Sequence, residues 1–189
     1  TFTHLERTPE PEVPETHDVK IRKVDISGKE IEGAALEVSH IENDMPVVDE
    51  EWISTSEPHE ITLRAGEYTL TEKQSPDGYE LAESINFIVN ENGAVIVNDV
   101  AGDSVIMCDK YSNHDVVISK ENVGGKELEG ADLSVTNSTG DVVEVWKSTT
   151  DKHTLSLQPG NYTLHENTAP AGYKVANDIE ITVGLDGTV

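Results

Sequence analysis

The sequence predicts an all-β protein built of two tandem β-sandwiches. The chain repeats itself: GKEIEGAALEV from Gly28 matches GKELEGADLSV from Gly125, and GEYTLTEKQSPDGYELA from Gly66 matches GNYTLHENTAPAGYKVA from Gly160. The offsets of 97 and 94 residues (125 − 28 and 160 − 66) are those of whole domains, because solenoid repeats have periods of about 20–50 residues. Short alternating runs separated by turn residues, with no helical period, indicate strands in both copies.

The apolar residues of the first copy alternate with polar ones as strands require. They do so at Val19–Val24, at Ile61–Leu70 around a turn at Gly66, and at Ile85–Val97 around a turn at Asn92-Gly93. The last of these runs has the pattern of a hairpin. The second copy opens on the same kind of run, at Val116 and Ile118.

The repeat also predicts the domain boundaries. We expect one sandwich at residues 18–113 and a second at 114–189, preceded at 1–17 by a linker or the tail of another module. The stretch TPEPEVPET at 8–16 is typical of a stiff, extended linker. The offset maps the last strand of the second copy beyond Val189, so we expect this sandwich to be truncated. No signal peptide, membrane span or sorting signal is visible, as expected for a fragment of a longer protein.

Charge and cysteine content limit the function classes. The chain has 37 acidic and 13 basic side chains and a formal net charge of -24, which would repel nucleic acid and anionic membranes. A single cysteine excludes an intramolecular disulfide, so a small extracellular domain would need another cross-link. The seven histidines show no metal-ligand spacing, and we expect neither a metal nor another cofactor.

Three chemical elements recur in both copies. Each has a lysine on its opening strand (Lys23 and Lys120), a glutamate directly after the YTL strand (Glu72 and Glu166), and then a Pro-x-Gly-Tyr turn. A lysine amine is nucleophilic only when neutral, and a carboxyl group accepts it only when protonated. Burial in an apolar core favours the neutral form of both.

The combined pattern identifies a family. The run K-x-D-x-x-G-K-x-(L/I)-x-G-A followed by G-x-Y-T-L-x-E-x-x-x-P-x-G-Y resembles the collagen-adhesin B-type (CnaB, SpaA-like or prealbumin-like) modules of Gram-positive adhesins and pilins, which are Ig-like sandwiches. The resemblance covers nearly all of residues 18–189. The first copy is most similar to the CnaB modules of streptococcal fibronectin-binding adhesins, through GKEIEGA, PDGYE and VIMCDKY.

The resemblance implies a spontaneous isopeptide bond in the first copy. Carried over by position, the lysine is Lys23, the acyl donor on the last strand is Asp109, and the assisting glutamate is Glu72. Because the donor is an aspartate, the bond would form with loss of water. In the second copy Lys120 and Glu166 have no acyl partner within the chain, so Lys120 is expected to be an unreacted amine.

Two rival assignments rank lower. Lys20 could replace Lys23, but Lys23 aligns with Lys120, whereas position 20 aligns with a valine. Asn113 could replace Asp109, but its neighbours are typical of a link between domains. Cys108 should point to the opposite face from Asp109 and serve as a small apolar filler.

The expected function is structural. These residues fit a stalk or spacer module of a cell-wall-anchored, extracellular protein of a Gram-positive surface, whose partners are the neighbouring modules of the same protein. The alternatives are a module that binds a host extracellular-matrix protein and a pilin subunit. An enzyme is not expected, because isopeptide formation happens once per chain and consumes its own residues.

Overall fold

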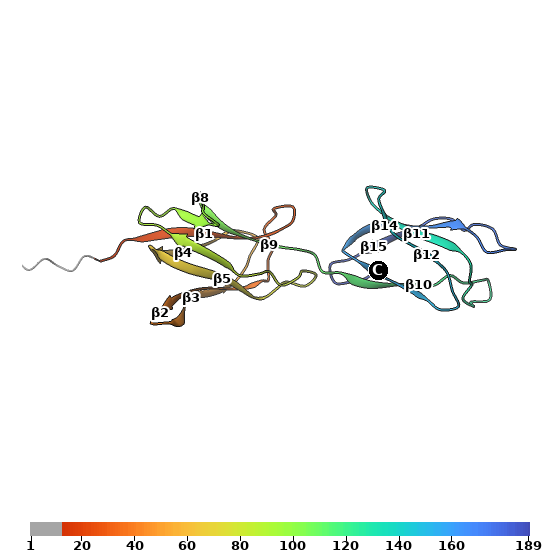
Figure 1. The fold of residues 1–189 in the computed structure, drawn as a ribbon, viewed down its shortest axis with the longest axis horizontal. Coiled ribbons are helices and arrows are strands. Elements are labelled where there is room, and N and C mark those ends of the chain that lie inside the picture. The colour runs from red at the N-terminus through yellow and green to blue at the C-terminus, as the bar shows by residue number, and fades with distance from the viewer. Residues whose placement is uncertain (1–12) are drawn as a thin grey trace, which may run out of the picture. The chain divides into compact units, whose positions relative to one another are not determined.

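In the computed structural model, which describes residues 13–189, every helix or strand element is a β-strand (Figure 1). The chain divides into two compact units, one reaching Gln74 and including Leu81–Cys108, the other containing Ser75–Glu80 and Asp109–Val189. Each unit has two sheets, which confirms the predicted tandem sandwiches. Of the linker or tail predicted at 1–17, residues 1–12 lie outside the described residues, and Thr16 and His17 already belong to the first strand of the sandwich.

Nine strands form the sheets of the first module. They are β1 (Thr16–Asp25), β2 (Ala35–Glu42), β3 (Met45–Ile53), β4 (His59–Arg64), β5 (Gly66–Gln74), β6 (Ile85–Val89), β7 (Val95–Val97), β8 (Val100–Gly102) and β9 (Ser104–Asp109). One sheet has the order β4-β1-β9 and the other β3-β2-β5-β6-β7-β8. Strand β9 is counted with this module because it is hydrogen-bonded into the first of these sheets.

The core of the first module lies between the inward faces of its two sheets. In β1, β2, β4, β5, β6 and β9 alternate residues point inward, as the period of two requires. These buried apolar side chains form one cluster, which includes Val19, Ile21, Leu36, Val38, Ile61, Leu63, Tyr68, Leu70, Phe87, Val89, Val105 and Met107. The polar residues discussed below occupy inward positions of the same series, near the ends of their strands.

Two tight turns lead into β3 and β8, two strands that the apolar pattern does not predict. Asn43 and Asp44 connect β2 to β3 with φ angles of 50° and 60°, and Asn98 and Asp99 connect β7 to β8 with 49° and 63°. Pairs of residues in the left-handed region form the two-residue hairpin turns that match strand twist, and asparagine and aspartate tolerate that region best after glycine.

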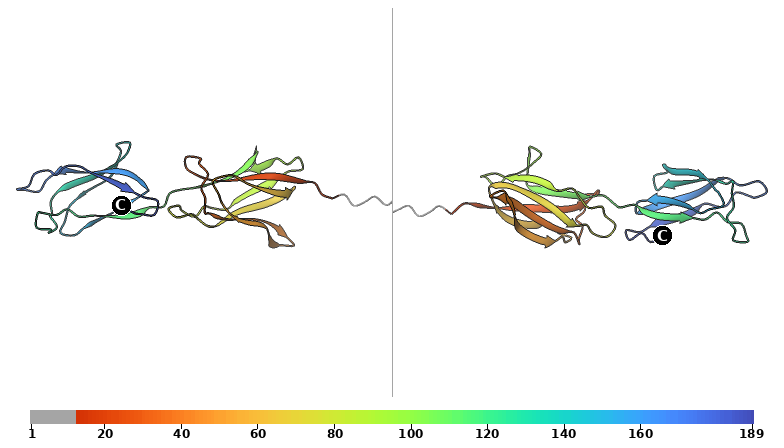
Figure 2. Two further views of the ribbon diagram at one scale, coloured as in Figure 1. Left: turned by 180° about the vertical axis from the view of Figure 1, so that it is seen from behind. Right: turned by 60° about the horizontal axis from the view of Figure 1, so that its bottom comes forward.

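Six strands form the second module (Figure 2). They are β10 (His114–Ile118), β11 (Asp132–Asn137), β12 (Val142–Lys147), β13 (His153–Leu157), β14 (Gly160–Thr168) and β15 (Ile179–Val183). One sheet pairs β10 with β13, and the other has the order β12-β11-β14-β15. Its core again comes from inward alternate positions, such as Val135, Leu155 and Tyr162.

Each module has an aromatic clasp between the edges of its two sheets. In the first module the Trp52 indole of β3 stacks on the His59 imidazole of β4 with ring centroids 4.4 Å apart, and His59 Nε2 lies 2.7 Å from Glu50 Oε1. Trp146, His153 and Glu144 repeat this in the second module, at 4.5 Å and 2.7 Å. Since β3 and β4 belong to different sheets, the clasp ties those sheets together.

Candidate cross-linking site

Three strands of the first module each end their inward series on a polar residue. On β1 the buried inward positions are Val19, Ile21 and then Lys23. On β5, Tyr68 and Leu70 are followed by Glu72, and on β9, Val105 and Met107 are followed by Asp109. The strand period therefore places an amine and two carboxyl groups in the core. Relative exposures of 2% for Lys23, 3% for Glu72 and 1% for Asp109 confirm this burial.

Lys23 and Glu72 meet inside the sandwich. Lys23 Nζ lies 3.0 Å from Glu72 Oε1, and the two side chains are 2% and 0% exposed. The second carboxylate oxygen, Oε2, accepts a hydrogen bond of 2.7 Å from the backbone N–H of Ala82, just after the Pro-x-Gly-Tyr turn. An isolated charge would be costly at such a depth, so the two groups stabilise each other's burial.

Asp109 lies on the strand next to Lys23. Strand β9 is the hydrogen-bonded neighbour of β1, and both strands carry their polar residue at or near their final position. The structure thus places an amine and two carboxyl groups in the core of one module. A primary amine and a carboxylic acid buried in this way can condense to an amide, because proximity replaces an encounter in solution.

The rival residues are placed differently. Lys20 is exposed on β1, and Asn113 is exposed and lies outside the strands. Cys108 points away from the buried Asp109, as strand alternation predicted. The prediction that Cys108 is a small apolar filler is wrong, because the residue is exposed. Cys108 lies on the outer face of β9, which is an edge strand of its sheet, so its side chain is exposed to solvent.

The second module repeats the lysine–glutamate pair. Lys120 Nζ lies 3.1 Å from Glu166 Oε1, while Glu166 Oε2 accepts a 2.6 Å hydrogen bond from the N–H of Ala176. The Lys120 side chain is 20% exposed, ten times the 2% of Lys23. Among residues 13–189, β10 pairs only with β13, whereas β1 has neighbours on both sides. The second amine is therefore less enclosed.

Sequence reasoning missed two features that recur in both modules. One is the pair of backbone N–H groups, at Ala82 and Ala176, that hold the two glutamates. The other is the aromatic clasp. Its residues follow the offset of 94 (146 − 52 and 153 − 59), so a residue-by-residue comparison of the two copies could have found it.

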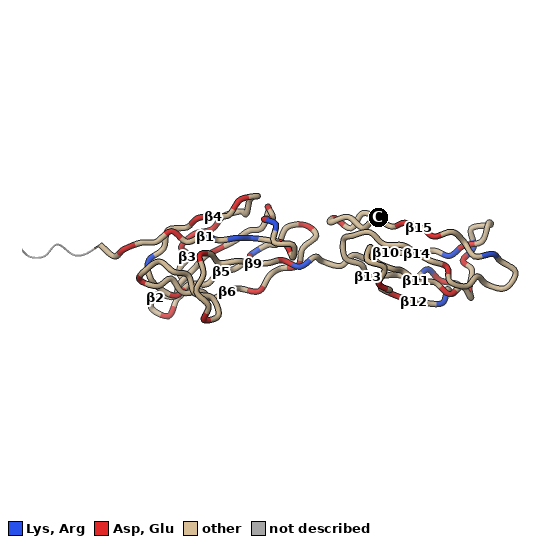
Figure 3. Tube along the Cα trace, turned by 90° about the horizontal axis from the view of Figure 1, so that it is seen from above, with Lys and Arg blue, Asp and Glu red and all other residues tan. Residues whose placement is uncertain are grey.

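No metal centre or membrane helix is found in the described part of the chain. No group of three or more histidine, cysteine, aspartate or glutamate side chains there could hold a metal ion. Nor does any helix within residues 13–189 have the length and apolarity needed to cross a bilayer. Acidic residues predominate on strands and loops of both modules (Figure 3).

Treatment with a chelator is expected to leave the melting temperature unchanged. The buried carboxyl group of Glu72 pairs with the amine of Lys23 at 3.0 Å, so it does not need a cation as a partner. Thermal unfolding followed by circular dichroism, with and without EDTA, provides the measurement. A fall of several degrees would reveal a metal site that the sequence and structure do not indicate.

Comparison with known proteins decides the family. A family model described as the SpaA prealbumin-like fold domain matches residues 17–103 and 114–189, which is most of the chain. The chain belongs to this family. Its two SpaA-family domains correspond to the two sandwiches described above. No curated protein matches the sequence.

Several solved structures are similar to this chain at low sequence identity. The TIE protein of Bacillus anthracis aligns with a TM-score of 0.52 at 23% identity, over 92% of this chain and 32% of that one. A C-terminal fragment of the pilus adhesin SpaC from Lactobacillus rhamnosus GG gives 0.41 at 18% identity, over 92% and 84%. The shaft pilin SpaA from the same organism gives 0.43 at 14%, over 92% and 95%. The chain thus spans about a third of the TIE protein's length.

Proposed function

We propose that this chain is a stalk or spacer segment of an adhesin anchored to the cell wall of a Gram-positive bacterium. In the proposal an isopeptide bond between Lys23 and Asp109 closes the first module, and Glu72 assists its formation. The observation that carries the proposal is the buried Lys23–Glu72 pair, 3.0 Å apart, together with the neighbour of β1, strand β9, which ends on the equally buried Asp109.

The proposed reaction is a condensation. The neutral amine of Lys23 attacks the carboxyl carbon of Asp109, forming the C–N bond, while a Glu72 carboxyl donates a hydrogen bond to the developing oxyanion. Glu72 then passes a proton to the departing hydroxyl, which leaves as water, and takes up a proton from the nitrogen. An amide and one water are the products, so atoms balance without a cofactor. Each chain reacts once, which is not enzymatic turnover.

A cross-link between these strands suits a load-bearing stalk. Lys23 lies on the first strand and Asp109 on the last strand of the same module. Tension along the chain would enter through one and leave through the other, and the intervening residues would carry none of it. The neighbouring modules of the same surface protein are then its partners.

Intact mass measurement of the purified protein tests the proposal. One bond in the first module should lower the mass by one water and not two, because Lys120 of the second module is proposed to remain an unreacted amine. A peptide containing Lys23 joined to Asp109 should appear after proteolysis. A full sequence mass with no deficit would exclude the cross-link, and a deficit of two waters would show that Lys120 reacts too.

A second candidate function is binding of a host extracellular-matrix protein. It is favoured by one observation, a groove of about 980 Å³ in the first module whose lining includes His40, Asp49, Arg64 and Ile88. Binding of immobilised matrix proteins by the chain and by its Arg64→Glu variant distinguishes the two functions. A spacer should bind in neither form. A pilin subunit, the remaining alternative, would share the same cross-link chemistry.

A further inference from the structure

We infer that Glu30 is a positioning residue that holds the backbone of Lys23 for amide formation, and that Glu127 holds Lys120 in the same way. This inference rests on the proposed cross-linking function. The family pattern leaves the position of Glu30 unspecified, between the lysine of G-K and the isoleucine that follows. The structure gives that position a direct contact with the reactive lysine.

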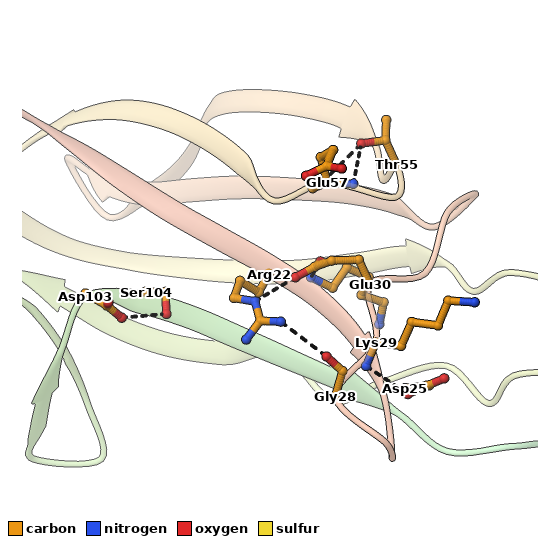
Figure 4. A network of polar contacts seen from close by, with 10 residues as sticks. Arg22, Asp25, Gly28, Lys29, Glu30, Thr55, Glu57, Asp103 and Ser104 are labelled. Atoms are coloured by element: carbon orange, nitrogen blue, oxygen red, sulfur yellow. Dashed lines mark hydrogen bonds and ion pairs between the residues drawn. The ribbon is translucent and has the colours of Figure 1, made fainter.

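The loop after β1 folds back and brackets the Lys23 peptide. The Lys23 N–H donates a 3.1 Å hydrogen bond to Glu30 Oε2, and the Lys23 carbonyl accepts one of 2.9 Å from the N–H of Ile31. The other carboxylate oxygen, Glu30 Oε1, lies 2.6 Å from Arg22 Nε (Figure 4). Two consecutive residues of the loop thus fix both polar groups of the lysine backbone.

The bracket begins where the regular ladder ends. The last pair between β1 and β4 is Ile21 with His59, so Lys23 lies two residues beyond it. In the second module the last pair is Ile118 with His153, and Lys120 again lies two residues beyond. Beyond these last pairs, β4 and β13 no longer hydrogen-bond to the strand that carries the lysine. The loop that folds back makes hydrogen bonds to the lysine backbone instead.

An aspartate turn shapes this loop in the first module. Asp25 Oδ1 accepts hydrogen bonds from the Ser27 N–H at 2.8 Å, the Ser27 hydroxyl at 2.6 Å and the Lys29 N–H at 3.1 Å. The Ser27 hydroxyl bond is the main reason why the pKa of Asp25 lies below its usual value. Gly28 takes a φ of 81° at the tip, a conformation that favours glycine. The family's D-x-x-G spacing therefore serves to return the chain to Lys23.

In the second module the same two hydrogen bonds hold the lysine backbone, but different residues shape the loop. The Lys120 N–H donates to Glu127 Oε2 at 3.1 Å, and the Lys120 carbonyl accepts from the Leu128 N–H at 2.6 Å. Asn122 takes the place of Asp25, and Gly125 has a φ of 74°.

The second carboxylate oxygen of each glutamate, Oε1, has a different partner in the two modules. Glu127 Oε1 accepts from the Ser119 hydroxyl, whereas Glu30 Oε1 pairs with an arginine. Of the side-chain contacts of these two glutamates, only the one with the lysine N–H is common to both modules. Holding this peptide fixes where the side chain starts, and small misplacements of a reacting group can slow a reaction by up to about 100-fold.

The rate of water loss in newly made protein tests the inference. The full chain is synthesised in a cell-free system, translation is stopped, samples are denatured in acid at intervals, and intact mass gives the cross-linked fraction. Glu30→Ala is expected to slow cross-linking at least about tenfold. Glu30→Gln should react at nearly the wild-type rate, because its amide oxygen still accepts the Lys23 N–H. Arg22→Gln, the matched control, should also react normally.

The variants separate positioning from a general loss of stability. Circular dichroism establishes that each variant is folded. If Glu30→Ala does not fold, Glu30→Asp replaces it; its shorter side chain keeps the charge but cannot reach the N–H, so it should be slow. Equal rates for wild type and Glu30→Ala, or slow Glu30→Gln and Arg22→Gln together, would overturn the inference. Absence of water loss from the wild type would instead refute the proposed function on which it rests.

Discussion

Asp109→Ala is expected to abolish the mass deficit and to lower the free energy of unfolding of the first module by about 4–5 kcal/mol. The bond would close a loop of 86 positions (109 − 23), and the loss of loop entropy in the unfolded chain gives this magnitude. For a domain of this size the melting temperature should fall by on the order of 20–30 °C. Mass spectrometry and differential scanning calorimetry measure both effects on the same sample.

Glu72→Gln and Glu166→Gln form a matched pair for this experiment. Both glutamates lie about 3 Å from a lysine and are held by a backbone N–H, but only Glu72 is proposed to assist a bond. Glu72→Gln should restore the missing water and lower the melting temperature, whereas Glu166→Gln should leave the deficit intact. A normal deficit in Glu72→Gln would rule out its assisting role.

Stretching single molecules should give an all-or-none difference between wild type and Asp109→Ala. Handles are attached at both termini, so force crosses the first module through Lys23 and Asp109. In the wild type the 85 residues between them (109 − 23 − 1) are bypassed by the bond and release no length. In the variant they should add about 300 Å when the module unfolds.

The second module supplies the internal reference for the stretching experiment. It contains no proposed bond, so its unfolding step should appear with the same length in both proteins. Release of the first module's full length from the wild type, in molecules whose mass shows the water deficit, would contradict the proposed path of the force.

Strands with one apolar face were predictable from the sequence, and strands without one were not. The alternation at Ile85–Val97 predicted the hairpin of β6 and β7, which pair antiparallel. Strand β3 escaped prediction because it lies at a sheet edge and most of its side chains are exposed, so it has no apolar period. The turn at Asn43-Asp44 was the only local signal of that hairpin.

The residues of the candidate site could be predicted from the sequence for a different reason. Lys23, Glu72 and Asp109 follow buried apolar residues at a spacing of two, so strand alternation alone would bury them, but polar strand residues usually face water. The repeat and the family resemblance indicated instead that these three residues form a buried site. Glu30 was missed because its contact depends on the loop returning to β1, and this return is set by the turn at Asp25 rather than by any period in the sequence.

The aromatic clasps have a spectroscopic consequence. The chain has two tryptophans, and each module contains one, stacked on a histidine of the opposite sheet. Indole emission depends on what lies against the ring, and here that neighbour is lost as soon as the two sheets part. Trp52→Phe and Trp146→Phe variants therefore each leave one fluorophore that reports on a single sandwich. The opening of either domain can be followed in the presence of the other without an attached dye.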